Sequence, residues 1–185
     1  MASTPEREVE GLLTLADSIV TRAKAGGVDV AECIVRAGRE LSAKVRLGKP
    51  EIVEEAGHRG AGLRVMKGKR VASTSTSDLS EAGLARFVAD ALELLELSQE
   101  DPFAGPADPK LLCDPAAQPD LQLFDPQGSA LTAEDAITRA RAGEAAALAS
   151  DPRITNSEGA TFGRNAGGFA MALSSGFRAG YTGSY

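Results

Sequence analysis

The hydrophobic periodicity of this chain changes near residue 27, and that change limits the folds it can adopt. Before Gly26 and Gly27 the apolar residues recur every three or four positions, which is the spacing of an amphipathic helix. After them apolar and polar residues alternate, which is the spacing of a strand with one buried face. The helical positions are Val9, Leu12, Leu13, Ala16, Ile19, Val20 and Ala23, and the alternating ones include Val28, Val30, Cys33, Val35, Leu41, Ala43, Val45 and Leu47. The pattern predicts a helix over residues 5–26 followed by a β-sheet.

Glycine and proline divide the strand region at predicted turns. We expect turns near Gly38, over residues 48–50 and over residues 67–69, because these residues favour turns over ladders. The strands between the turns would cover residues 28–35, 41–47, 52–53, 63–66 and 71–76. Four or five antiparallel strands therefore follow the first helix.

Two further helices are predicted, over residues 78–97 and 132–149. Each begins with a pair of the capping-box type, in which a polar residue is followed three positions later by an acidic one. The pairs are Asp78 with Glu81 and Thr132 with Asp135. The second of these helices is rich in alanine, which allows it to pack closely.

The segment between these helices, residues 98–128, combines prolines with aspartates, so neither a strand nor a helix can run far. We expect a long surface segment. Its apolar side chains would clamp it onto the domain: Phe103, Leu111, Leu112, Leu121 and Phe124. After residue 152 the strand pattern returns, with turns expected at residues 167–168 and near Gly176.

Together these patterns predict an α+β (α/β) fold, in which an antiparallel or mixed sheet of about five strands packs with about three helices and is followed by glycine-rich strands. Residues 1–128 would form the amino-terminal domain, including the surface segment. Residues 129–185 would complete it or lead to a second domain. The last residues, 180–185, carry no cap or polar tail, so we expect a truncated chain or a gene fragment.

The composition excludes several classes of protein. No apolar run approaches the roughly 18 residues that a membrane helix needs, and acidic residues occupy the place of a signal peptide, so we expect a cytoplasmic protein with no membrane partner. Cys33 and Cys113 are too few for a disulfide framework and should both be reduced. The net charge of −6 argues against nucleic-acid binding. A basic set keeps that function as a low-ranking alternative: Arg59, Arg64, Lys67, Lys69 and Arg70.

Motifs for catalysis are weak throughout. The single histidine, His58, cannot supply a zinc site or a catalytic triad, and Ser157 lacks the first glycine of a nucleophile elbow. The glycine-rich residues 60–70 have the wrong spacing for a phosphate-binding loop. The adjacent acids Glu54-Glu55 and Glu134-Asp135 suit a strand and a helix start. We predict no catalytic residue, no cofactor-binding residue and no metal ligand in this chain.

Four stretches of the chain resemble PmbA/TldE-type proteins, in the same order and with similar spacing. They are residues 76–80 (Thr-Ser-Asp-Leu-Ser), 98–105 (Ser-Gln-Glu-Asp-Pro-Phe-Ala-Gly), 153–160 (Arg-Ile-Thr-Asn-Ser-Glu-Gly-Ala) and 176–181 (Gly-Phe-Arg-Ala-Gly-Tyr). The resemblance runs from the first helix to the last residue. It implies the amino-terminal domain of a protein more than twice this length.

The resemblance also implies a function. The family pairs TldD and TldE subunits into a cytosolic zinc metalloprotease that cuts unfolded peptides, including microcin precursors and an antitoxin. The zinc ligands, a His-Glu-x-x-x-His motif and a cysteine, lie in TldD, beyond the stretch matched here. The family's older name is modulator of DNA gyrase. The expected partners are therefore a TldD-type subunit, or a second copy, and an unfolded peptide that adds as a strand to a sheet edge, for which residues 155–183 are the better candidates.

The first hypothesis is thus the amino-terminal domain of the non-metallated, TldE/PmbA-like subunit of such a protease, with zinc only in the partner. The second is a stand-alone interaction module or gene fragment without a proteolytic role. Nucleic-acid binding is the third.

Overall fold

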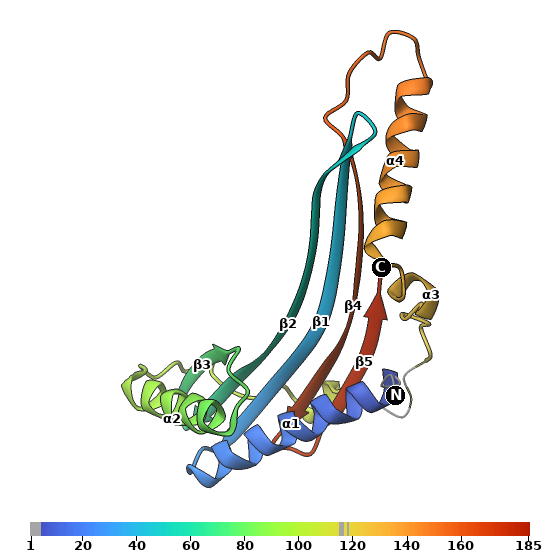
Figure 1. Ribbon diagram of the computed structural model, residues 1–185. Coiled ribbons are helices and arrows are strands. Elements are labelled where there is room, and N and C mark those ends of the chain that lie inside the picture. The colour runs from blue at the N-terminus through green and yellow to red at the C-terminus, as the bar shows by residue number, and fades with distance from the viewer. Residues whose placement is uncertain (1–4, 115–116, 118) are drawn as a thin grey trace. The chain divides into compact units, whose positions relative to one another are not determined.

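The computed structural model describes residues 5–114, 117 and 119–185 (Figure 1). Its elements in chain order are α1 (Pro5–Ala25), β1 (Val30–Arg46), β2 (Lys49–Lys67), β3 (Arg70–Thr76), α2 (Glu81–Leu97), a 3-10 turn (Pro109–Leu111), α3 (Pro126–Ser129), α4 (Ala133–Ala149), β4 (Ala160–Leu173) and β5 (Arg178–Ser184). The strands form one sheet in the order β3-β2-β1-β4-β5. The predicted α+β fold with a five-stranded antiparallel sheet is confirmed.

The described chain divides into two compact units, each built from three segments. The first unit holds residues 1–37, 59–121 and 168–182, and the second holds residues 38–58, 122–167 and 183–185. The long strands β1, β2 and β4 each contribute residues to both units, so a single boundary at one sequence position does not separate the two units. The expected division after residue 128 stays a prediction about domain organisation.

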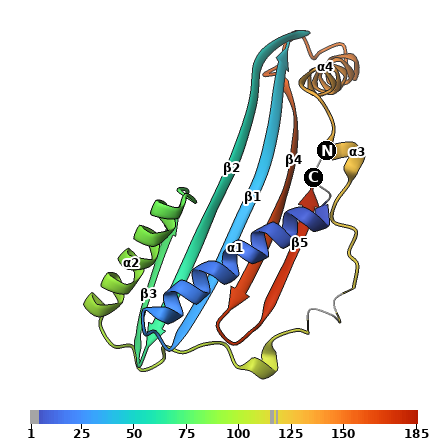
Figure 2. The ribbon, with the colours of Figure 1, turned by 60° about the horizontal axis from the view of Figure 1, so that its bottom comes forward.

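The first unit contains the larger core, where α1 and α2 pack against the sheet (Figure 2). The apolar stripe of α1 is buried, and its acidic first turn and basic last turn suit the helix dipole. The largest fully buried side chains of the first unit's core are Ile19, Leu63, Leu95, Val35, Val65 and Cys33. Arg22 in the last turn of α1 forms an ion pair of 2.8 Å with Glu81 in the first turn of α2.

The second unit contains the turn between β1 and β2, helix α4 and the first part of β4. Its small core consists of Leu41, Ala43 and Ala136, with Ala133, Ile137 and Phe162 partly buried against it. Helix α4 begins with the predicted capping box: Thr132 accepts the N–H of Asp135, whose carboxylate accepts the N–H of Thr132 at 2.8 Å. The alanines let this helix approach the strands closely.

The turn predicted at Gly38 is wrong, because β1 continues without interruption to Arg46. A Cβ on Gly38 would lie 2.7 Å from the ring of His58, so this glycine permits close approach of a neighbouring side chain. The glycines of β2 and Gly167-Gly168 of β4 likewise lie inside strands. The turns at Gly48, Gly68 and Gly176 are confirmed, and all three glycines have positive φ.

Two other details of the expected fold are corrected. Helix α2 is capped by Ser80, whose hydroxyl accepts the N–H of Gly83, while Asp78 accepts the N–H of Ser80 instead. The segment over residues 98–128 is clamped only in part, because Phe103, Leu111 and Leu121 are exposed while Leu112 and Phe124 are half-buried. Proline and aspartate satisfy this segment locally with short turns. None of the described helices is long and apolar enough to cross a membrane.

Candidate functional site

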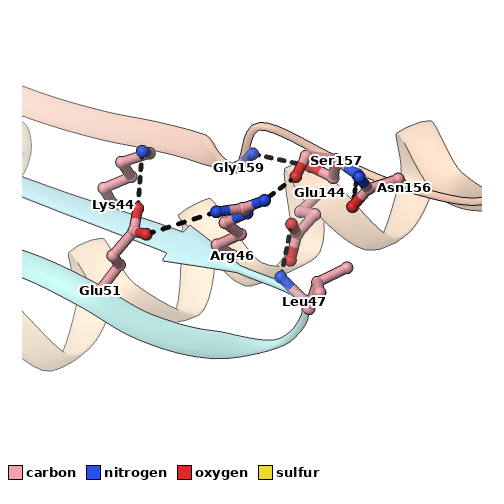
Figure 3. A network of polar contacts seen from close by, with 8 residues as sticks. All are labelled: Lys44, Arg46, Leu47, Glu51, Glu144, Asn156, Ser157 and Gly159. Atoms are coloured by element: carbon pink, nitrogen blue, oxygen red, sulfur yellow. Dashed lines mark hydrogen bonds and ion pairs between the residues drawn. The ribbon is translucent and has the colours of Figure 1, made fainter.

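The second unit carries two polar arrangements, of which the first joins α4 to the turn between β1 and β2 (Figure 3). Glu144 of α4 is only 3% exposed. Its two carboxylate oxygens accept the N–H groups of Leu47 and Gly48, each at 2.8 Å. These bonds hold the pKa of Glu144 below its usual value, with the Gly48 N–H the largest cause. A buried carboxylate that accepts two backbone N–H groups stays ionised near neutral pH.

The surrounding side chains complete this arrangement, and they are paired with one another. Lys44 contacts Glu51 at 2.6 Å, and Arg46 donates to the carbonyl of Ser157 at 3.1 Å. The hydroxyl of Ser157 accepts the N–H of Gly159 at 2.8 Å (Figure 3). The pKa of Glu51 is lowered, chiefly by Lys44. The network therefore positions the hairpin and the loop before β4, and the Ser157 side chain within it also hydrogen-bonds to the carboxylate of Glu144.

The second arrangement is a groove of about 530 Å³ in the same unit. It is lined by β1, β2, β4 and the last residue: Glu40, Leu41, Ser42, Glu54, Ala56, Gly163, Arg164, Asn165 and Tyr185. Acidic, hydroxyl-bearing, amide, basic and aromatic residues therefore line one hollow. Such a concave mixture of polar and apolar groups is typical of a binding site.

Among the described residues that line this groove, Arg164 is the basic one, and its side chain is 10% exposed. Its Nε donates to the carbonyl of Leu131 at 2.8 Å, and one terminal nitrogen lies 3.5 Å from the carboxylate of Glu55. The other terminal nitrogen is buried and has no hydrogen-bond partner among the described residues. A buried guanidinium with an unused donor is costly, so Arg164 is incompletely satisfied in this fold.

His58, the single histidine of the sequence, lies exposed on β2. Within the described residues, no three side chains of His, Cys, Asp or Glu lie close enough to hold a metal ion. His58 rests against Gly38 of the adjacent strand. Ser157, the nearest match to a nucleophile elbow, accepts the N–H of Gly159 in its own loop and also hydrogen-bonds to Glu144 of α4.

The two cysteines lie in different surroundings. Cys33 is fully buried in β1, and burial, with a smaller effect of the Asp17 charge, raises the pKa of its thiol to about 12. Cys113 is exposed. The expectation that Cys33 behaves as a small apolar core residue is confirmed.

The basic set on β2 and β3 is mostly engaged with neighbouring groups. Arg64 pairs with Glu32 at 2.5 Å, and Lys67 with Glu96 at 3.9 Å. Arg70 donates to the carbonyl of Glu96, and Lys69 to that of Ala104. These contacts favour a role in keeping the hairpin soluble over one in binding phosphates.

The two acidic pairs have different roles. Asp135 caps α4 as expected. Glu55 pairs with Arg164 and Glu54 lines the groove, which the sequence did not indicate. Sequence reasoning also missed Glu144 and Arg164. The available signals were a lone acid inside an alanine-rich helix and a lone arginine inside a glycine-rich strand.

Comparison with known proteins connects the chain to one family. The model described as PmbA/TldA metallopeptidase domain 1 matches residues 31–95. Metalloprotease PmbA of Escherichia coli O157:H7 is 36% identical over 170 residues, which cover 92% of this chain and 37% of that protein. A Metalloprotease PmbA homolog of Haemophilus influenzae is 33% identical over 162 residues, covering 88% and 34%. The chain thus spans little more than a third of these curated relatives.

Solved structures show the same fold. A proposed modulator of DNA gyrase from Bacteroides thetaiotaomicron superposes with a TM-score of 0.81 at 22% identity, covering 99% of this chain and 40% of that one. TldE from Thermococcus kodakarensis superposes with a TM-score of 0.72 at 16% identity, covering 92% and 37%. Both likenesses concern the arrangement of helices and strands.

Proposed function

Because this chain carries an amino-terminal domain of the PmbA/TldE type, we propose that it forms part of the non-metallated subunit of a TldD/TldE-type zinc metalloprotease. The single observation that carries the proposal is the 36% identity to Metalloprotease PmbA along 92% of the chain. At family level the domain is metalloprotease-associated. The assembly, the metal arrangement and the substrates are proposed.

In this proposal the zinc ion is held by the TldD-type partner. Among the described residues of this chain, no three side chains of His, Cys, Asp or Glu are placed to hold a metal ion. The chain would contribute the wall of the chamber in which the partner works, and the complex would act in the cytoplasm on unfolded peptides.

A peptide without fixed structure is best held by main-chain hydrogen bonds, because these do not depend on its sequence. In the region suggested for this, residues 155–183, β4 is excluded because it lies between β1 and β5, whereas β5 is an edge strand of the sheet. Near the end of β5, the backbone N–H of Ser184 already donates to the carbonyl of Leu123 at 2.8 Å, so that part of the strand is occupied.

The second unit offers a better edge. Strand β3 pairs with β2 only from Ala61 to Lys67. Among the described strands, residues 49–58 of β2 therefore have a neighbour on one side only, which is β1 (Figure 1). Every residue of this stretch is exposed, including Ile52 and Val53. We propose it as the strand to which an extended peptide adds.

Reconstitution tests this function. The chain is co-expressed with a TldD-type subunit of the same organism, and the purified mixture is assayed for cleavage of an unfolded peptide. Cleavage that requires both chains supports the proposal. A TldD-type subunit that neither binds this chain nor changes its activity in its presence contradicts it.

A further inference from the structure

The turn between β1 and β2 holds a leucine in a backbone conformation that disfavours it. Leu47 has a φ of 49° and Gly48 a φ of 76°. Positive φ at both central residues is the geometry of a type I′ hairpin turn, which favours asparagine, aspartate or glycine over larger side chains. Asparagine would therefore form this turn at lower cost than leucine does. The choice of leucine is not explained by the turn.

Packing within the chain does not explain Leu47 either. Its side chain is 57% exposed, and neither hydrophobic core of the described residues contains it. Figure 3 shows the side chain pointing away from the carboxylate of Glu144. The backbone is held firmly, because that carboxylate accepts the N–H groups of Leu47 and Gly48 at 2.8 Å each. The turn thus presents an apolar side chain outward in a fixed position.

Polar groups next to the turn already have partners. Lys44 contacts Glu51 at 2.6 Å, and Arg46 donates to the carbonyl of Ser157 at 3.1 Å. An apolar side chain beside polar groups that are paired among themselves matches the anatomy of a protein interface, which has an apolar centre and a polar rim. Residues 44–55 carry three basic and three acidic side chains, so they offer no excess positive charge to the anionic headgroups of a membrane. These observations favour a protein as the partner over a lipid surface.

We propose that Leu47 anchors this domain to the TldD-type subunit by inserting its side chain into an apolar pocket of that subunit. The inference rests on the proposed function and names a contact through which the two chains assemble. A residue that the fold disfavours, and that is nevertheless rigidly held and exposed, is typical of a position used for binding. The turn directly precedes residues 49–58 of β2, so a subunit bound there lies beside the strand to which the peptide adds.

The test is isothermal titration of the 185-residue chain with the purified TldD-type subunit of the same organism. Leu47→Asn removes the apolar side chain but suits the turn, so its two effects should have opposite signs. We expect the Tm of the chain to rise by about 2–4 °C, because the positive φ no longer opposes folding. We expect the Kd to increase at least about tenfold, because the interface loses a buried leucine. An unchanged Kd overturns the proposal.

Two further variants separate the anchor from a general loss of apolar surface. Leu47→Met keeps an unbranched apolar side chain of similar volume, so the Kd should stay within about twofold of the wild-type value. Leu97→Asn makes the same chemical change at a leucine that is 76% exposed at the end of α2, and it should leave the Kd unchanged. Equal losses of affinity in Leu97→Asn and Leu47→Asn overturn the proposal, as does a tenfold loss in Leu47→Met.

Failure of this inference can be told apart from failure of the proposed function. A wild-type chain that binds the TldD-type subunit as tightly as Leu47→Asn does contradicts the anchor and leaves the proposed function standing. A wild-type chain that does not bind the subunit at all contradicts both. Sedimentation of the wild type, but not of Leu47→Asn, with phosphatidylserine vesicles would assign Leu47 to a lipid surface and would also overturn the proposal.

Discussion

Glu144 in α4 and Gly48 at the turn between β1 and β2 are joined by a hydrogen bond of 2.8 Å across 96 residues of sequence. Leu47 donates to the second carboxylate oxygen, so one buried acid holds both residues of the turn. Both have positive φ, 49° for Leu47 and 76° for Gly48. This φ is uncommon for leucine, so the acid stabilises a turn that the sequence alone disfavours.

Glu144→Gln should therefore destabilise the chain. Glutamine has one acceptor oxygen where the turn presents two N–H groups, so one buried donor loses its partner. We expect the Tm to fall by about 3–5 °C. Glu134→Gln, at an exposed position in the first turn of α4, is the matched control and should change the Tm by less than about 1 °C. Equal Tm values for the two variants would show that the hydrogen bonds from Leu47 and Gly48 to Glu144 contribute nothing to stability.

The same carboxylate predicts a pH dependence. Its folded-state pKa lies below the ordinary value of 4.5, so the stability it contributes is fully present above about pH 5. That contribution is lost as the pH falls through the lowered pKa, because protonation removes an acceptor. Thermal melts should show a smaller loss of Tm from about pH 5 to pH 3 in Glu144→Gln than in the wild type. Identical losses would contradict this assignment, since the other lowered acids, such as Asp135, are present in both chains.

Gly159 should not tolerate alanine. Its φ is 102°, and a Cβ would lie 2.7 Å from the carbonyl oxygen of Val45. Gly159→Ala should cost about 2 kcal/mol of unfolding free energy in urea. Gly143→Ala is the matched control, because a Cβ there would make an ordinary contact of 3.9 Å with Ala160. In a helix it should stabilise by about 0.5–1 kcal/mol. Changes of equal sign in the two variants would refute the argument.

The two cysteines should differ in reactivity. Cys33 is buried and has a thiol pKa of about 12, so almost none of it is thiolate at pH 8. Iodoacetamide should therefore modify only Cys113 in the folded chain, and both cysteines in urea. Mass spectrometry of digested samples distinguishes these outcomes. Rapid modification of Cys33 in the folded chain would mean that β1 is not packed as described.

Local signals in the sequence were sufficient for the helices. The apolar stripe of α1 and the Thr132–Asp135 box of α4 depend on residues a few positions apart, and both predictions are confirmed. The turn predicted at Gly38 was wrong because a glycine can indicate either a turn or a place where a neighbouring side chain approaches the backbone closely. Gly38 serves the second purpose, and only the position of His58 reveals this.

The polar sites could not be predicted for a related reason. Glu144 and Arg164 resemble many surface residues when only their neighbours in sequence are considered. Their partners, Gly48 in a turn and Glu55 in β2, are distant in sequence and are brought near by the fold. Burial without complete pairing distinguishes Arg164, and burial is a property of the folded chain.

The central claim is that this domain assembles with a TldD-type subunit. The most direct measurement is light scattering on a size-exclusion column, applied to the purified chain, to the purified TldD-type subunit and to their mixture. We predict a new species in the mixture that contains both chains and has a mass equal to whole-number multiples of the two. Two separate peaks with the masses of the unmixed proteins, at concentrations of about 10 μM, where interfaces of standard size are occupied, would contradict the claim.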